Sequence, residues 1–162
     1  MSTLINIAGT PIQFPTSAQS PNWAQAVTDF AKAVEGALSS YVGPYDIPPQ
    51  VLNIDASNPA SNSDLPNLAF PTSTVRSAFI RYAVFRQTDT VTVAESGNLQ
   101  VVYNPANPVN NKWEIARDYV GDASVTFTIS DIGQVKYSTA TIAGSSHTGQ
   151  ITYVAQSILQ SS

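Results

Sequence analysis

Apolar and polar residues alternate with a period of two through most of the second half of the chain. In SVTFTIS, Val125, Phe127 and Ile129 alternate with polar residues, and HTGQITYVAQ repeats the pattern. Such alternation is typical of β-strands that are buried on one face. The segment 131–134 (DIGQ) follows the first of these runs and predicts a hairpin turn, because its glycine can adopt a left-handed conformation. The final segment predicts a strand with three apolar residues on one face: Ile151, Tyr153 and Ala155.

Three more strand-like segments precede these. STVRSAFIRYAVFRQT is apolar on both faces, which predicts a strand that is covered on both sides or that lies at a subunit contact. We expect it to supply much of the core and of the contacts, through Phe79, Ile80, Tyr82, Val84 and Phe85.

The segment TVTVAESGNLQVVYN predicts two strands joined by a turn at 95–98 (ESGN). The segment KWEIARDYV predicts one more strand, in which Trp113, Ile115 and Tyr119 alternate with Glu114 and Asp118.

One helix is expected, over residues 21–39. Ser20 is suited to the N-cap and Pro21 to the first turn, where a missing N–H costs nothing. An apolar stripe follows at helical spacing: Trp23, Val27, Phe30, Val34 and Leu38. A single helix of this length is marginally stable alone. We therefore expect Trp23, Phe30 and Val34 to dock it against a sheet or a neighbouring subunit.

Proline divides the chain. Nine of the eleven prolines lie at or before Pro71, and none follows Pro108. Residues 1–72 therefore read as an N-terminal extension with Pro-rich connectors and a short strand at 51–55, and residues 73–162 as an antiparallel β-sandwich. We expect one compact unit that includes strands from the first part. Seven or eight strands at this spacing predict a mainly β fold, an antiparallel sandwich or jelly-roll-like domain with one N-terminal helix.

Charge is scarce. Charged residues make up 11% of the chain, against about a quarter in typical domains. The net charge of −4 argues against nucleic acid as a partner, since such binders need a basic surface. The chain lacks cysteine, a recognisable signal peptide and a run of about 18 apolar residues that could span a membrane. We expect synthesis in a cytoplasm and no membrane partner.

The candidate catalytic residues do not form a recognisable catalytic motif. His147 lies beside Ser145 and Ser146, but a triad needs a nucleophile, a base and an orienting carboxylate in contact. Paired carboxylates could catalyse glycoside hydrolysis, and the candidates are Glu95, Glu114 and Asp118. Glu95 falls in a predicted turn, and Glu114 and Asp118 fall on the polar side of a strand, so none forms an evident acid–base pair.

Asp122 follows a glycine and is expected to shape a turn. Calcium could bind the oxygen-rich set Asp55, Asn58, Asn62 and Asp64, but turn chemistry accounts for these residues without a metal. We therefore assign no catalytic, cofactor-binding or metal-ligating residue.

The arginines allow two interpretations. Arg76, Arg81, Arg86 and Arg117 are most of the basic residues, and Arg81 shares a strand face with apolar side chains. It is either a rim residue whose guanidinium lies in water, or part of an ion pair with Glu114 or Asp118.

Aromatic residues raise the possibility of a sugar-binding surface, because sugars stack on exposed rings. The candidates are Tyr41, Tyr45, Tyr103 and Trp113. Trp113, however, alternates in phase with residues that are expected to be buried.

Several segments resemble small structural proteins of tailed bacteriophages. They are NWAQAVTDFAKAVEGAL, VGPYDIPP and the stretch from WEIARDYVGDASVTFTI through GQVKY to TGQITYVAQSIL. The order of the C-terminal motifs is similar to modules in head-decoration and fibre proteins. The resemblance implies a jelly-roll-like module that commonly forms a homotrimer on the virion.

The resulting hypothesis is a non-enzymatic virion structural protein that contacts itself and major capsid or other virion proteins. An alternative is a receptor- or carbohydrate-binding module of a tail fibre, whose partner would be a cell-surface glycan. A third is a wall-degrading hydrolase.

Overall fold

Eight of the strands form a sandwich, and a helix with a separate hairpin precedes it. The computed structural model describes residues 3–7, 10–14, 23–41, 43–54 and 62–160; side chains are described from residue 25 onward, except for residues 37–41. The chain divides into two units, Met1–Pro44 and Tyr45–Ser162. Each unit is described by itself. The division falls earlier than the expected boundary at residue 72, because the strands between residues 45 and 72 pair with the sandwich.

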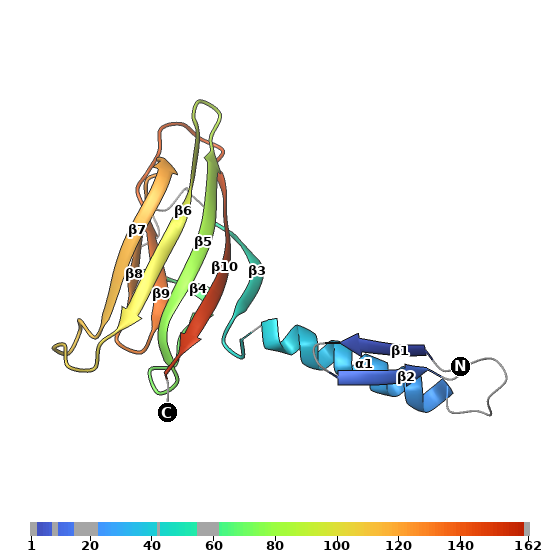
Figure 1. Ribbon diagram of the computed structural model, residues 1–162. Helices are drawn as coiled ribbons and strands as arrows, with labels where there is room; N and C mark the ends of the chain where they lie inside the picture. The colour runs from blue at the N-terminus through green and yellow to red at the C-terminus, as the bar shows by residue number, and fades with distance from the viewer. Residues whose placement is uncertain (1–2, 8–9, 15–22, 42, 55–61, 161–162) are drawn as a thin grey trace. The chain divides into compact units, whose positions relative to one another are not determined.

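The first unit holds an antiparallel hairpin and the helix α1 (Figure 1). The hairpin joins β1 (Thr3–Ile7) to β2 (Thr10–Phe14), and α1 extends over Trp23–Tyr41. The hairpin packs along the helix. It was not predicted, because each strand is five residues long and shows little alternation.

The predicted apolar stripe of α1 is not its buried side. Val27 is 54% exposed and Phe30 is 39% exposed, whereas Ala26 on the flank is only 6% exposed. Val34 is half-buried. Because β1 and β2 are the elements of this unit that contact α1, we attribute the burial of Ala26 to the hairpin. Val27 and Phe30 thus stay exposed within this unit, and the expected docking of the stripe on a sheet or a neighbouring subunit stays a prediction; the side chains of Trp23 and Leu38 lie outside the described residues.

The second unit is an antiparallel β-sandwich of two sheets, which confirms the predicted fold class (Figure 1). One sheet has five strands in the order β3–β10–β5–β6–β7, and the other has three in the order β4–β9–β8. The strands are β3 (Ile47–Asn53), β4 (Ser63–Ala69), β5 (Val75–Gln87), β6 (Thr92–Tyr103), β7 (Trp113–Gly121), β8 (Val125–Ile129), β9 (Gln134–Thr139) and β10 (Thr148–Leu159).

The core lies between the two sheets. Ile80, Leu99 and Ile151 of the larger sheet are fully buried, as are Leu68 and Val135 on the opposite side. Burying side chains of this size contributes about 1.5–3 kcal/mol each. The alternation predicted for Ile151, Tyr153 and Ala155 is confirmed, since each is at most 2% exposed.

The hairpin of β8 and β9 is also confirmed. Its turn uses Gly133, whose φ of 84° lies in the left-handed region and whose N–H donates to the Ser130 carbonyl at 2.8 Å. A Cβ at this position would lie 2.0 Å from the Phe70 carbonyl oxygen, so only glycine fits. The strand predicted at 51–55 begins earlier, at Ile47. It accommodates Pro48 and Pro49 because β3 is an edge strand with one neighbour, β10.

The predicted turn at Glu95–Asn98 is wrong, because β6 is one continuous strand. Gly97 lies in its middle and pairs with Tyr82 on one side and Tyr119 on the other. A Cβ on Gly97 would lie 2.3 Å from the Asp118 carbonyl oxygen and 2.7 Å from the Tyr119 Cβ. The glycine therefore permits a close approach of β7 and does not mark a turn.

The strand β5 is buried on one face and not on both. Ile80, Tyr82 and Val84 are at most 5% exposed, but Phe79 and Phe85 are each 45% exposed. Of the two alternatives expected for this strand, coverage on both sides within the chain does not hold, and a subunit contact stays a prediction. The second face is open, and it belongs to the surface described next.

Candidate interaction surface

The side of the five-stranded sheet that points away from the three-stranded sheet is here called the outer face. Strand pairing and alternating burial define its residues. They are Val51 of β3; Gln150, Thr152, Val154, Gln156 and Ile158 of β10; Ser77, Phe79, Arg81, Ala83 and Phe85 of β5; Ala94, Ser96, Asn98, Gln100 and Val102 of β6; and Glu114, Ala116, Asp118 and Val120 of β7.

Large apolar side chains are exposed across the outer face. Phe79 and Phe85 stand on its central strand, Val120 is 80% exposed, and Ile158 is 65% exposed. Scattered single apolar residues are normal on protein surfaces, but several large ones on the same sheet face favour an interaction site. The polar residues between them are mostly uncharged amides and hydroxyls.

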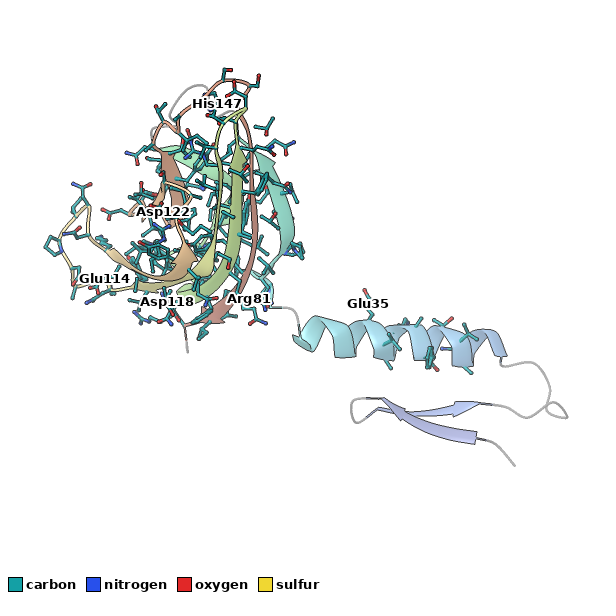
Figure 2. The ribbon with its side chains drawn as sticks, turned by 90° about the horizontal axis from the view of Figure 1, so that it is seen from above. Glu35, Arg81, Glu114, Asp118, Asp122 and His147 are labelled. Carbon is teal, nitrogen blue, oxygen red and sulfur yellow. The ribbon has the colours of Figure 1, made fainter. Side chains whose placement is uncertain are left out.

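Three charged residues lie on the outer face: Arg81, Glu114 and Asp118 (Figure 2). Arg81 on β5 pairs with Asn98 on β6, and Asn98 pairs with Asp118 on β7. Arg81, Asn98 and Asp118 therefore share one row of the sheet. One strand separates Arg81 from Asp118, a distance of about 9.6 Å between backbones. Within the described residues no ion pair joins Arg81 to Asp118 or Glu114. Arg81 lies in the middle of β5, the central strand, and not at a rim of the sheet.

The outer face is hollowed by three shallow, open depressions. The first, about 490 Å³, lies beside Ala83 and Val120. The second, about 370 Å³, lies between Arg81 and Asp118. The third, about 380 Å³, lies between Phe79 and Ala116. They follow one another along β5, β6 and β7, so the face is corrugated.

The structure also contains a buried ion pair that the sequence analysis missed. Glu95 is 3% exposed and pairs with Arg117. Its carboxylate also accepts hydrogen bonds from the Tyr82 hydroxyl at 2.7 Å and from the Ala123 N–H at 3.2 Å. Arg117 donates further bonds to the Tyr82 hydroxyl and the Val125 carbonyl, each at 2.8 Å.

This cluster joins β5, β6 and β7 to β8. Burial, followed by the bond to Glu95, raises the pKa of Tyr82 to about 12. The signal in the sequence is the two-residue period: Arg117 lies on the same strand face as Trp113 and Ile115, and Glu95 lies on the same face as Leu99 once β6 is taken as one strand. The polar groups of the cluster bond to one another and to the neighbouring backbone, and we assign the cluster a structural role.

Arg86 is fully buried near one end of the sandwich. Its guanidinium donates to the Ala123 carbonyl at 2.7 Å and the Ala140 carbonyl at 2.6 Å. Burial lowers its pKa. In the described part of the chain the side chain makes no ion pair, and its contacts tie the segments after β7 and β9 to β5.

His147 and its neighbouring serines do not form a triad in the described structure. The Ser145 hydroxyl donates to the Asp89 carboxylate at 2.6 Å, and the Ser145 N–H donates to it at 2.7 Å. These bonds lower the pKa of Asp89. In a triad the serine hydroxyl would contact the histidine instead, and the adjacent Ser146 is exposed.

The other carboxylates serve turns and surfaces. Asp122 accepts from the Ser124 N–H at 2.7 Å, which confirms its predicted role in a turn. Asp64 pairs with Lys136 on the surface, and Asn62 accepts from the Thr128 hydroxyl. Asp55 and Asn58 lie outside the described residues. Among those that are described, no group of three or more His, Cys, Asp or Glu could hold a metal.

The aromatic candidates for sugar binding are not gathered on the surface. Trp113 is 5% exposed, and its ring lies 5.2 Å from that of Tyr103 between centroids. Tyr45 and Tyr103 are half-buried and pack against the core. The Tyr41 side chain lies outside the described residues.

Comparison with known proteins yields two distant structural likenesses. No family model matches the chain, and no curated protein matches it. The tailspike protein of Acinetobacter phage vB_ApiP_P1 is 13% identical at a TM-score of 0.35, over 68% of this chain and 22% of that one. The tailspike protein of Acinetobacter baumannii phage AM24 is 12% identical at a TM-score of 0.36, over 70% of this chain and 26% of that one.

The chain thus spans about a quarter of the length of these tailspikes. Both likenesses are too remote to assign a function. Among the described residues, no helix is long and apolar enough to cross a membrane.

Proposed function

We propose that the protein is a non-enzymatic structural component of a bacteriophage virion, and that it acts by self-association through the outer face of its five-stranded sheet. The observation that carries the proposal is the exposure of Phe79 and Phe85 on the central strand of that face, together with Val120 on β7 and Ile158 on β10. A strand that is apolar on both sides gains stability when its second face is also covered.

The outer face is large enough for a stable contact. Five strands about 4.8 Å apart and five outward rows about 6.8 Å apart cover roughly 800 Å². A standard interface buries about 800 Å² on each partner. Covering this face also prevents non-specific contacts, against which a charge-poor surface gives little protection.

The virion assignment is supported by the sequence resemblance to small phage structural proteins. That resemblance implies a homotrimer in a head-decoration or fibre position, with major capsid or other virion proteins as additional partners. The low charged fraction of 11% fits a surface that is partly covered by neighbours.

The alternative, a receptor- or carbohydrate-binding module, requires exposed aromatic rings with polar groups that converge on a ligand. Trp113 and Tyr103, which the sequence offered for sugar stacking, lie in or against the core and do not support this alternative.

The experiment compares particles made with two variants. Phe79→Asp/Phe85→Asp places two carboxylates on the outer face, whereas Ile132→Asp alters a residue that is 78% exposed in the β8–β9 turn. Each tagged protein is supplied to the phage that encodes it, and purified particles are assayed by immunoblot. We expect wild type and Ile132→Asp in particles and the double variant absent. Absence of the wild type from particles would refute the virion assignment, and equal incorporation of all three would refute the role of the outer face.

A further inference from the structure

We infer that neighbouring copies meet about an axis parallel to the strands of the five-stranded sheet, so that Arg81 of one copy pairs with Asp118 of the next. The inference rests on the proposed self-association and specifies the geometry of that contact. The partner is a second copy of this chain.

The first support is the position of the charges. Arg81 on β5 and Asp118 on β7 lie in one row, on either side of Asn98 on β6. Rotation about an axis parallel to the strands keeps every row at its own height. When the axis lies over β6, it brings β5 of one copy toward β7 of the next, and opposite charges then face each other in each repeat of the contact.

An axis perpendicular to the strands would have a different result. It would reverse the order of the rows, and when the Arg81 row lies at the centre it would place Arg81 against Arg81. Like charges at a contact are costly, and a closed contact repeats that cost in every copy.

The second support is the size of the side chains in the rows on either side. Phe79 on β5 shares a row with Ala116 on β7, through Gln100. Ala83 on β5 shares the next row but one with Val120 on β7, through Ser96. In the parallel-axis contact a large residue therefore meets a small one in both rows, as close packing requires.

The depressions agree with this pairing. The depression of about 380 Å³ between Phe79 and Ala116 leaves room above the alanine for the phenylalanine of a neighbouring copy. The depression of about 370 Å³ between Arg81 and Asp118 lies where the ion pair would form.

The third support is the environment of the acidic residues. Glu114 accepts a hydrogen bond from the Asn107 side chain at 2.7 Å within its own chain. Asp118 has no recorded partner in the described part of the chain, and neither has Arg81. Arg81 and Asp118 are therefore the pair of opposite charges left for a neighbouring copy.

The experiment is a charge reversal followed by sedimentation equilibrium over a range of concentrations. We expect Arg81→Glu and Asp118→Arg each to weaken assembly by at least about tenfold, because each opposes like charges. The double variant restores the pair with its signs exchanged, and we expect it to recover to within about threefold of wild type. Lys136→Glu makes the same change of charge on the other sheet and should have no effect. Circular dichroism confirms the fold of each variant.

A second variant tests the packing independently of charge. Ala116→Phe fills the depression beside Phe79 and should weaken assembly as strongly as either charge reversal. If the wild type assembles while the single reversals and Ala116→Phe assemble equally well, the inferred geometry is wrong and the proposed self-association stands. If the wild type does not assemble, both are wrong.

Discussion

Replacement of Arg117 by methionine tests whether the buried ion pair holds the sandwich together. The change keeps much of the side-chain volume but removes the charge that compensates Glu95, which is 3% exposed. Glu95 keeps the bonds from the Tyr82 hydroxyl and the Ala123 N–H, and the Val125 carbonyl loses its donor.

Breaking a buried pair in this way costs about 3–5 kcal/mol. We expect Arg117→Met to lower the free energy of unfolding by that amount, measured by guanidinium denaturation followed by circular dichroism at a fixed protein concentration. Lys136→Met is the matched control. It breaks a pair whose Asp64 side chain is 59% exposed, and such surface pairs contribute at most about 1 kcal/mol.

The double variant Glu95→Leu/Arg117→Met tests whether the uncompensated charge of Glu95 causes the loss of stability. Because it leaves no uncompensated charge, we expect it to be more stable than Arg117→Met alone. A loss below about 1 kcal/mol for Arg117→Met, or a double variant that is no more stable, would contradict the assigned role of the pair.

Three further predictions concern other parts of the molecule. Gly97→Ala should lower the free energy of unfolding by about 1–3 kcal/mol, because the new Cβ would lie 2.3 Å from the Asp118 carbonyl oxygen. Gly36→Ala in α1, where an added Cβ would meet no atom within 4 Å beyond the helix's own backbone, should stabilise by up to about 1 kcal/mol. Urea denaturation of both variants checks the contrast, and equal effects would contradict it. The pKa of Tyr82 is raised from 10.0 to about 12, so its contribution to stability is complete below pH 10 and is lost as the pH rises toward 12. Between pH 8 and pH 12 the free energy of unfolding should therefore fall less for Tyr82→Phe than for wild type. If it falls equally in both proteins, the raised pKa of Tyr82 is refuted. Phe30→Asp should weaken assembly if the exposed side of α1 docks on a neighbouring copy, and light scattering that shows unchanged assembly would rule out that docking.

The strands that could be predicted from the sequence are those that depend on residues close by in the chain. The β8–β9 hairpin combines strict alternation with a glycine at the turn, and the final strand buries Ile151, Tyr153 and Ala155 as their spacing indicates. These features depend on neighbours within a few residues, so a single sequence carries them.

The errors have non-local causes. Gly97 reads as a turn residue, but it is required by the backbone of β7, more than twenty residues away in the chain. That error placed Glu95 in a turn and hid its pairing with Arg117. Likewise, the sequence shows that β5 is apolar on both sides, but only the strand order shows which face the three-stranded sheet covers. The row that aligns Arg81 with Asp118 also depends on pairing across β6.

The central claim is that the outer face is covered by other copies of the chain. The most direct test is the mass of the purified protein in solution by light scattering, over a range of concentrations. The account predicts about three times the chain mass of 17.2 kDa, and a shift to the single-chain mass for Phe79→Asp/Phe85→Asp. A wild-type protein that keeps the single-chain mass at every concentration would contradict it.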